Sequence, residues 1–191
     1  MDYKGDLYFI GQVLAGNQNA FRHIVEKHKD HAFNLAIRIC CNREEAEEIA
    51  QDAFVKAYKS LAQFKMKSSF ATWLYRIVYN TSISLVRSRK KALLSIEDFP
   101  ADIIDFAGTN TNDEEAESEY RNAIVNFALQ KLSEEERGLI GLYYYEELSI
   151  EEIGAISGIS KSNIKVRLFR TRQKMLEIIQ KVEKKNLVYH E

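Results

Sequence analysis

Basic and amide side chains gather at the start of one predicted helix, between residues 160 and 172. The amide of Asn suits the hydrogen-bonding edge of adenine, and Lys or Arg suits that of guanine. Lys161, Asn163 and Lys165 lie in the first turns of this helix, where helix-turn-helix proteins contact base edges. Arg170 and Arg172, which lie further along the helix, are expected to contact phosphates. The candidate DNA contacts are Ser160, Lys161, Ser162, Asn163, Lys165, Arg167, Arg170 and Arg172.

A helix-turn-helix pattern surrounds these residues, in LSIEEIGAISGISKSNIKVRLFRTRQKM. A Ser-x-x-Glu capping box at Ser149 and Glu152 predicts a first helix, and Gly158 supplies the left-handed residue of the turn. Residues 160–185 hold nine bases and two acids, which favours binding to phosphates. A plain helical hairpin with a solvated basic face is the alternative. The residues expected on the buried side are Ile150, Ile153, Ile156, Ile159, Ile164, Leu168, Met175 and Leu176.

Aromatic and basic side chains interleave in a second segment, QFKMKSSFATWLYRIVYN, at residues 63–80. Residues 53–96 carry nine bases and no acid. Aromatic rings can stack on unpaired bases beside a basic surface that attracts the phosphate backbone. Core packing is the alternative role for these aromatic residues. Trp73 can combine both roles, because one face of its large ring can pack in the core while the edge contacts DNA. The aromatic residues are Phe64, Phe70, Trp73, Tyr75 and Tyr79.

Charge is strongly segregated along the chain, although the net charge is only −1. Residues 43–52 have five acids and one base, and residues 97–120 have nine acids and no base. The second stretch contains the sole proline, Pro100, and few large apolar groups, so it predicts an exposed, mobile linker. The sequence therefore predicts two domains, residues 1–94 and 119–186, joined by a flexible acidic linker at residues 95–118.

Helical periodicity predicts an all-α fold with two small helical domains. Apolar residues recur every three or four positions in the first domain, as one face of an amphipathic helix requires. We expect its helices at residues 20–36, 43–61 and from about 69 onward, with a shorter helix at 4–15. The second domain is expected to begin with helices at 120–131 and 134–145, before the helix-turn-helix.

Several classes of function lack their signatures. No apolar run approaches the ~18 residues of a membrane span, and the N-terminus does not resemble a signal peptide, so we expect a soluble, cytoplasmic protein without membrane insertion. No phosphate-binding glycine loop or nucleophile with a base is visible, which argues against an enzyme. Cys40 and Cys41 are expected to be a buried apolar pair, and His28 and His31 to be solvated. We expect no metal and no cofactor.

The motifs together resemble the extracytoplasmic-function (ECF) sigma factors of the sigma-70 family. AEEIAQDAFVKAYKSLAQFK is similar to the polymerase-binding segment of sigma domain two, and FATWLYRIVYN to its promoter-melting helix. The helix-turn-helix segment is similar to sigma domain four. The resemblance covers nearly the whole chain. One departure is Ser84, where members usually have Asp four residues after the Asn that corresponds to Asn80.

The resemblance implies a protein that binds core RNA polymerase and recognises and melts promoter DNA. It implies contacts to the clamp helices of the beta-prime subunit and the flap of the beta subunit, a linker near the RNA exit path, and an anti-sigma factor as controller. The implied clamp contacts are Glu47, Glu48, Gln51, Asp52, Phe54 and Lys56, with Phe54 as an exposed aromatic anchor. The implied minus-ten contacts are Phe64, Lys65, Lys67, Ser68, Ser69, Trp73, Arg76, Asn80, Arg87, Arg89, Lys90 and Lys91.

A one-component regulator, with a ligand-sensing first domain and the same helix-turn-helix, is the competing interpretation. Such a sensor should show a composition that forms a pocket. The first domain instead places an acidic helix beside a basic, aromatic helix, which explains binding to both a protein and DNA.

Overall fold

The computed structural model describes residues 3–93 and 113–188, with the side chains of 5–91 and 120–184. Every regular element in these ranges is helical, as the sequence predicts. The first domain contains α1 (Tyr3–Leu14), a short turn η1 (Gln18–Ala20), α2 (Phe21–Cys40), α3 (Arg43–Lys59), a second turn η2 (Leu61–Gln63) and α4 (Phe70–Leu93). The second contains α5 (Asp113–Gln130), α6 (Glu134–Ile140), a wide π-helical turn η3 (Gly141–Tyr145), α7 (Ile150–Ser157) and α8 (Lys161–Val188).

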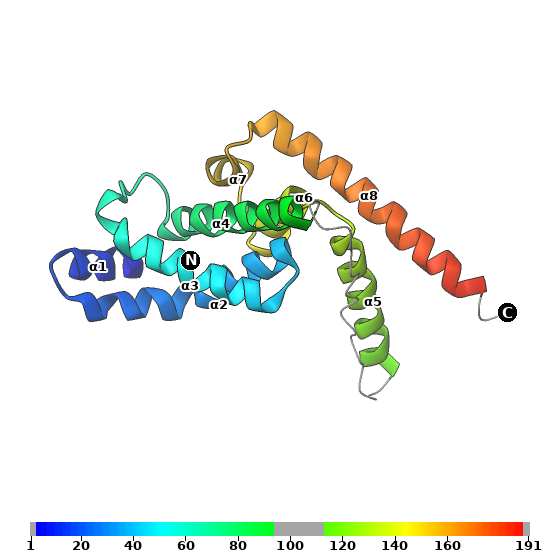
Figure 1. The fold of residues 1–191 in the computed structure, drawn as a ribbon, viewed down its shortest axis with the longest axis horizontal. Coiled ribbons are helices and arrows are strands. Elements are labelled where there is room, and N and C mark those ends of the chain that lie inside the picture. The colour runs from blue at the N-terminus through cyan, green and yellow to red at the C-terminus, as the bar shows by residue number, and fades with distance from the viewer. Residues whose placement is uncertain (1–2, 94–112, 189–191) are drawn as a thin grey trace.

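Helices α2, α3 and α4 pack against one another and form the body of the first domain (Figure 1). Their facing sides carry fully buried apolar residues such as Leu35, Ile49 and Leu74. Asn42 starts α3 by accepting a hydrogen bond from the backbone N–H of Glu45 at 2.9 Å, as an N-cap does. The predicted three-helix core is therefore present, and α1 packs against α2 beside it.

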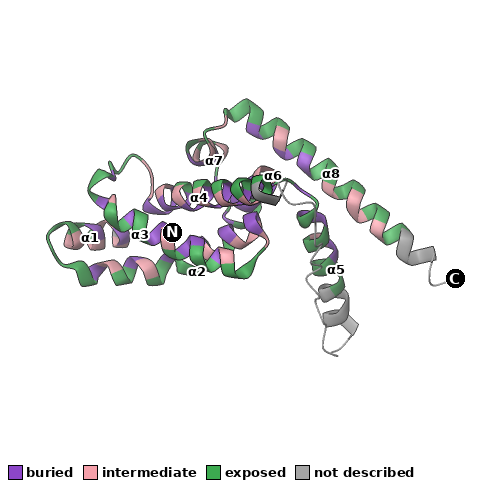
Figure 2. Ribbon diagram, viewed as in Figure 1, coloured by how far each residue is buried: buried purple, intermediate pink, exposed green. Residues whose placement is uncertain are grey.

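The two domains pack directly against each other. Helix α4 contacts α6 and α7, and α2 contacts α6 and η3. Buried residues of both domains belong to one continuous apolar cluster, which runs from Ile24 and Leu74 to Leu139 and Ile153. Figure 2 shows the buried residues concentrated where these helices meet, whereas α5 and the second half of α8 extend away from the body. The sequence pattern alone contained no sign of this contact.

Two helix boundaries differ from the sequence-based expectation. Helix α5 begins at Asp113 rather than at residue 120. The predicted linker thus loses residues 113–118 to a helix, and its remaining part lies outside the described residues. The helix expected at 134–145 becomes wider after Ile140, where η3 packs on α2.

The prediction of a solvated His28 is wrong. The residue is 2% exposed, its Nε2 lies 3.1 Å from Oδ2 of Asp6 on α1, and its ring packs near Phe70. Burial lowers the pKa of His28, and the neighbouring Asp6 offsets only part of that effect. His31 is exposed, but its Nδ1 lies 2.8 Å from the buried carboxylate of Glu146 in the second domain.

The prediction for the cysteines is correct for Cys40 and wrong for Cys41. Cys40 is buried, whereas Cys41 is half-buried and ends α2 in the left-handed conformation, with φ of 56°. Its backbone N–H donates to the carbonyl of Ile37 at 2.8 Å, which satisfies one of the last carbonyls of the helix. Both thiols are free.

Candidate nucleic-acid and polymerase interfaces

A pocket of about 260 Å³ opens along one side of α4, next to the segment that follows α3. Trp73, Arg76, Ile77 and Asn80 recur at steps of three and four along α4, so they share one side of the helix. Sequence reasoning found Trp73, Arg76 and Asn80, and the same helical spacing could have added Ile77. The residues that line the pocket are Ser60, Gln63, Trp73, Arg76, Ile77 and Asn80.

Three aromatic rings pack together beside this pocket, and one of them, Trp73, lines it. The ring of Trp73 lies 5.2 Å from that of Phe64 and 5.6 Å from that of Phe70, and the two Phe rings meet edge to face at 5.9 Å. Phe64 is only 8% exposed, so it is not the surface contact that the resemblance implied. It supports Trp73, which is half-buried and keeps part of its ring at the surface. Trp73 therefore serves in the core and on the surface at once.

The loop before α4 presents polar and basic side chains. Lys65 and Lys67 are exposed on either side of Met66, which has a positive φ of 53° and an exposed side chain. Ser69 accepts a hydrogen bond from the backbone N–H of Thr72 at 2.9 Å and so holds the start of α4. Ser68 and Ser69 are half-buried, which leaves the two lysines as the accessible charges of the loop.

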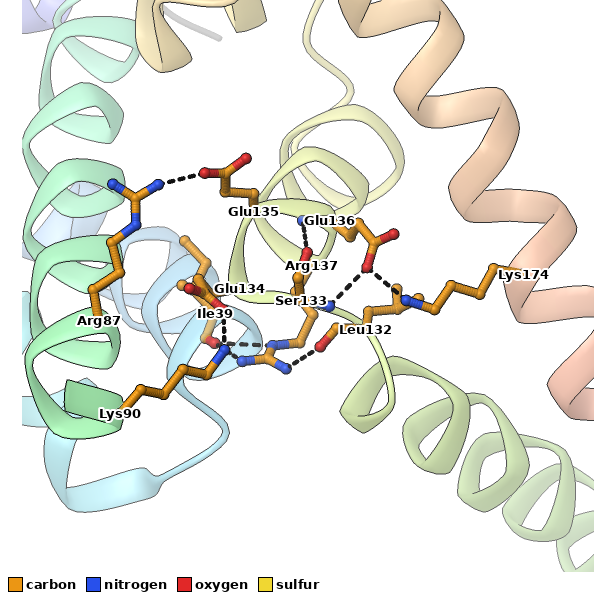
Figure 3. Close-up of polar contacts among 10 residues, drawn as sticks. All are labelled: Ile39, Arg87, Lys90, Leu132, Ser133, Glu134, Glu135, Glu136, Arg137 and Lys174. Carbon is orange, nitrogen blue, oxygen red and sulfur yellow. Dashed lines mark hydrogen bonds and ion pairs between the residues drawn. The ribbon is translucent and has the colours of Figure 1, made fainter. Parts of the chain in front are cut away.

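The C-terminal part of α4 carries Arg87, Arg89, Lys90 and Lys91, but most of these bases are already paired. Arg89 donates from NH1 to both carboxylate oxygens of Glu45 on α3, at 3.0 Å each. Arg87 pairs with Glu135 and Lys90 with Glu134, both on α6 of the second domain (Figure 3). The sequence predicted these bases as a free DNA surface, and the structure brings acids of the other domain to two of them.

The helix-turn-helix of α7 and α8 has the geometry that its sequence predicts. Ser149 and Glu152 form a reciprocal capping box, with the backbone N–H of Ser149 donating to Glu152 at 3.0 Å. Gly158 has a φ of 73°, and its N–H donates to the carbonyl of Gly154 at 2.9 Å. A Cβ on Gly154 would lie 3.3 Å from the carbonyl oxygen of Ile159 in the turn and 3.6 Å from Cδ1 of Ile164 on α8, so α7 lies close to both at this position.

The first turns of α8 present most of the predicted reading residues to solvent. Lys161, Ser162, Asn163 and Lys165 are exposed, as are Ser160, Arg170 and Arg172. Arg167 is half-buried, and its NH1 donates to Glu135 at 2.6 Å. On the opposite side, Ile164 and Leu168 are buried as predicted.

Leu176, by contrast, is 49% exposed. The prediction of a buried Leu176 is wrong because this part of α8 extends away from the packed helices of the molecule (Figure 1).

Helix α3 presents an acidic face with an apolar end. Glu47, Glu48, Gln51 and Lys56 are exposed, and Asp52 is half-buried and paired with Lys56 at 2.6 Å. The side chain of Phe54 is buried, which contradicts its predicted role as the exposed anchor, because it points into the core with Ala53 and Ala57.

Two other apolar residues of α3 reach the surface instead. Val55 and Tyr58 are 49% and 37% exposed. They continue the line of Glu48 and Gln51 at helical spacing. The amphipathic pattern could have identified them, since Phe54 falls on the apolar stripe and these two fall beside it.

Within residues 3–93 and 113–188, no helix is both long and apolar enough to cross a membrane. The same part of the chain holds no cluster of three or more His, Cys, Asp or Glu side chains arranged to bind a metal ion.

Comparison with known proteins places both domains. Residues 24–92 match the family described as Sigma-70 region 2, and residues 128–176 match Sigma-70, region 4. The chain is 36% identical over 176 residues to the ECF RNA polymerase sigma factor SigW of Bacillus subtilis, covering 86% of this chain and 91% of the relative. It is 30% identical over 182 residues to the RNA polymerase sigma-H factor of Pseudomonas aeruginosa, covering 92% and 94%.

The fold agrees with a solved relative. The sigma factor RpoE of Bartonella quintana, solved in complex with the anti-sigma factor NepR, superimposes with a TM-score of 0.68 at 25% identity, covering 84% of this chain and 96% of that one. A ligand-sensing regulator would not carry both sigma regions in this order. The chain therefore belongs to the ECF sigma factors of the sigma-70 family, which recognise promoters for RNA polymerase and initiate transcription.

Proposed function

We propose that the pocket on α4 receives an unpaired base of the minus-ten element during promoter melting. A half-buried indole beside guanidinium and amide groups offers a stacking surface together with hydrogen-bond donors and acceptors. Among the residues that the structure describes, Arg76 is the one charged side chain that lines the pocket, which suits a neutral base with its phosphate outside. The single observation that carries this proposal is the convergence of Trp73, Arg76 and Asn80 on one cavity.

The remaining minus-ten residues have supporting parts in this proposal. Lys65, Lys67, Ser68 and Ser69 lie in the loop before α4, and we assign the exposed lysines to backbone phosphates. Arg87, Arg89, Lys90 and Lys91 extend the basic track along α4. Phosphate contacts position the strand, whereas the pocket reads a base.

The pocket can be tested in reconstituted holoenzyme with promoter fragments that differ at single minus-ten bases. We expect Asn80→Ala to flatten the preference at one base position, and Trp73→Ala to reduce melting of all fragments. Asn34→Ala, which removes an exposed Asn of α2 away from the pocket, is the matched control. If Asn80→Ala kept the wild-type base preference, the pocket would not be the reader.

We further propose that the first turns of α8 read the minus-thirty-five element. Ser160, Lys161, Ser162, Asn163, Lys165 and Arg167 are assigned to base edges, and Arg170 and Arg172 to phosphates. The solvent exposure of all but Arg167 supports this division.

The face of α3 is proposed to bind the clamp helices of the polymerase beta-prime subunit. Glu47, Glu48, Gln51, Asp52 and Lys56 supply the polar contacts, and Val55 and Tyr58 replace Phe54 as the apolar anchor. The second domain is assigned to the flap of the beta subunit. The protein would act in the cytoplasm as a non-catalytic initiation factor without a cofactor.

An anti-sigma factor is the proposed controller, because the related structure from Bartonella quintana was solved with one. Co-elution of the chain with core polymerase, and its loss on addition of such a partner, would test both assignments. We keep residues 1–94 and 119–186 as the proposed domains and 95–118 as the segment between them, of which residues 113–118 belong to α5. The family matches at 24–92 and 128–176 lie inside the two domains.

A further inference from the structure

One carboxylate connects the two proposed DNA-binding surfaces. Glu135, in the first turn of α6, pairs through Oε1 with Arg87 of α4 and accepts a hydrogen bond at Oε2 from NH1 of Arg167 on α8, at 2.6 Å. The adjacent Glu134 pairs with Lys90 of α4. Figure 3 shows Arg87 and Lys90 reaching from α4 to these two acids. Each proposed DNA surface thus has at least one cation neutralised by the same turn of helix.

Local structure holds this acidic turn in place. Ser133 and Glu136 form a capping box at the start of α6, in which the backbone N–H of Ser133 donates to Glu136 at 2.7 Å. Lys174 of α8 donates to the same Glu136 at 2.9 Å. The capping box and Lys174 therefore hold the turn that carries Glu134 and Glu135 through contacts within the second domain.

Buried contacts beneath the turn hold the two domains together. Arg137 is 7% exposed, and its Nε and NH2 donate to the carbonyl of Ile39, at 2.9 and 2.5 Å, near the C-terminal end of α2. That end of a helix has carbonyls without helical partners and favours a cation. A Cβ on Gly138 would lie 2.5 Å from the ring of Tyr79, so α6 rests directly on α4.

A third contact buries a carboxylate in the same interface. The hydroxyl of Tyr75 on α4 donates to Oε2 of Glu146 at 2.6 Å, and that carboxylate is only 3% exposed. Surface ion pairs by themselves contribute little to stability. The packing of the two domains against each other, called the closed arrangement below, is therefore stabilised mainly by the buried contacts of Arg137, Tyr75 and Glu146.

We propose that the acidic first turn of α6 is an internal competitor for promoter phosphates. In the free chain Glu134 and Glu135 form ion pairs with Arg87, Lys90 and Arg167, so neither proposed DNA surface carries its full positive charge. Separation of the domains releases Arg87 and Lys90 together, whereas Arg167 stays paired with Glu135 inside the second domain. The proposal rests on the proposed function, which assigns these cations to DNA.

The closed arrangement leaves the base pocket accessible. Arg76 and Asn80 are exposed and Trp73 is half-exposed in the same structure that pairs Arg87 and Lys90. The acids of α6 therefore compete with DNA phosphates and not with bases. The free chain should show this weakened binding on DNA of any sequence.

The test measures binding of the full-length chain, without polymerase, to mixed-sequence duplex DNA over about 50–200 mM salt. Glu135→Gln removes the shared charge and keeps the side-chain size. Freeing two arginines should tighten binding about threefold to tenfold at the low-salt end and steepen the log-log salt slope by about one to two units. Asp30→Asn, at an exposed acid of α2, makes the same change in net charge and should leave the slope unchanged.

A second variant opens the interface without changing charge. Gly138→Leu places a side chain where Tyr79 lies. We expect a larger radius of gyration by X-ray scattering, retained helical circular dichroism and tighter DNA binding, because Arg87 and Lys90 are released from α6. Equal effects of Glu135→Gln and Asp30→Asn would overturn the proposal. So would an unchanged radius of gyration in Gly138→Leu, or an expanded chain that binds DNA no better.

Failure of this proposal is separable from failure of the proposed function. If the variants bind DNA no better while Asn80→Ala still flattens base preference in holoenzyme, the internal competitor is refuted and the pocket stands. If Asn80→Ala has no effect while the DNA gain appears, the pocket assignment fails and the internal competitor stands.

Discussion

His28 is the residue in which burial changes chemistry most directly. It lies between α1 and α4, with Asp6 as its polar partner and Phe70 against its ring. Burial disfavours the imidazolium form, because a charge in the core loses its hydration. The folded protein therefore holds His28 neutral at pH values where an unfolded chain would begin to protonate it.

This lowered pKa predicts a pH dependence of stability. Because the unfolded chain binds the proton first, the free energy of unfolding should fall as pH drops below about 6.5, the ordinary pKa of His. Carboxylates with lowered pKa values, such as Glu134 and Glu136, contribute only at lower pH, near and below about 4.3. Urea unfolding at pH 7.5 and 5.5 measures the slope, and His28→Gln should reduce it. An NMR titration that gave His28 a pKa of 6.5 or higher would contradict this prediction.

Gly158 and Gly11 form a natural pair for testing backbone conformation. Gly158 has a φ of 73° in the turn between α7 and α8, whereas Gly11 lies inside α1 with open space where a Cβ would go. Gly158→Ala should lower the free energy of unfolding by about 1 kcal/mol, because a side chain is strained in the left-handed region. Gly11→Ala should raise it by up to about 1 kcal/mol through helix propensity. Chemical denaturation compares the two, and equal effects would remove the conformational explanation.

At the scale of elements, α3 combines two functions on opposite sides. Its apolar stripe, with Ala46, Ile49 and Phe54, forms the core, and its other side carries the acidic face and the apolar end at Val55 and Tyr58. Because the helix is fixed from within, changes on the outer side should affect binding without affecting the fold.

Charge reversal on α3 tests this separation. The double variant Glu48→Lys with Asp52→Lys should weaken binding to core polymerase at least tenfold, the equivalent of about 1.4 kcal/mol, because it reverses the charge of the proposed contact. Glu26→Lys with Asp30→Lys, on the exposed side of α2, serves as the control. Titration of labelled chain with core polymerase gives both affinities. Unchanged binding in a folded double variant would show that α3 does not face the clamp.

Helix α8 separates into reading and anchoring residues along its length. Asn163→Ala should relax preference at one or two positions of the minus-thirty-five element, a loss of about 1–3 kcal/mol of discrimination. Arg172→Ala should weaken binding to all sequences alike and lower the salt slope by about one unit. Titrations on single-base variants at several salt concentrations distinguish the two patterns. A uniform loss from Asn163→Ala would move that residue to the phosphate group.

For the whole molecule, the shared core predicts that the two domains unfold together. Apolar residues of both domains form one buried cluster, and burial raises the pKa of Tyr79 within it to about 12. Exposing that surface in one domain alone would cost hydrophobic free energy, so thermal unfolding of the free chain should be a single transition. Calorimetry of the wild-type chain measures it. Gly138→Leu should broaden or split the transition, and two resolved transitions in the wild-type chain would contradict a common core.

The sequence by itself determined the elements, the family and the direction of most functional side chains. Capping boxes, the turn glycine and apolar spacing act within a few residues, so Ser149, Gly158 and the helices that they bound follow from local chemistry. Trp73, Arg76 and Asn80 were found because basic and aromatic residues share a segment without acids. Phe64 and Leu176 were misassigned because burial depends on which distant element covers each side chain. Phe54 falls on the apolar stripe of α3, so the local pattern already favoured its burial.

Only the tertiary structure decided how the domains meet. Glu135 lies 48 positions after Arg87 and 32 positions before Arg167, and no local pattern connects the three residues. The close approach of Gly138 to Tyr79 and the hydrogen bonds of Arg137 to Ile39 are likewise long-range. Local propensity specifies a helix and its faces, but the pairing of faces depends on shape and charge that become adjacent only when the chain has folded.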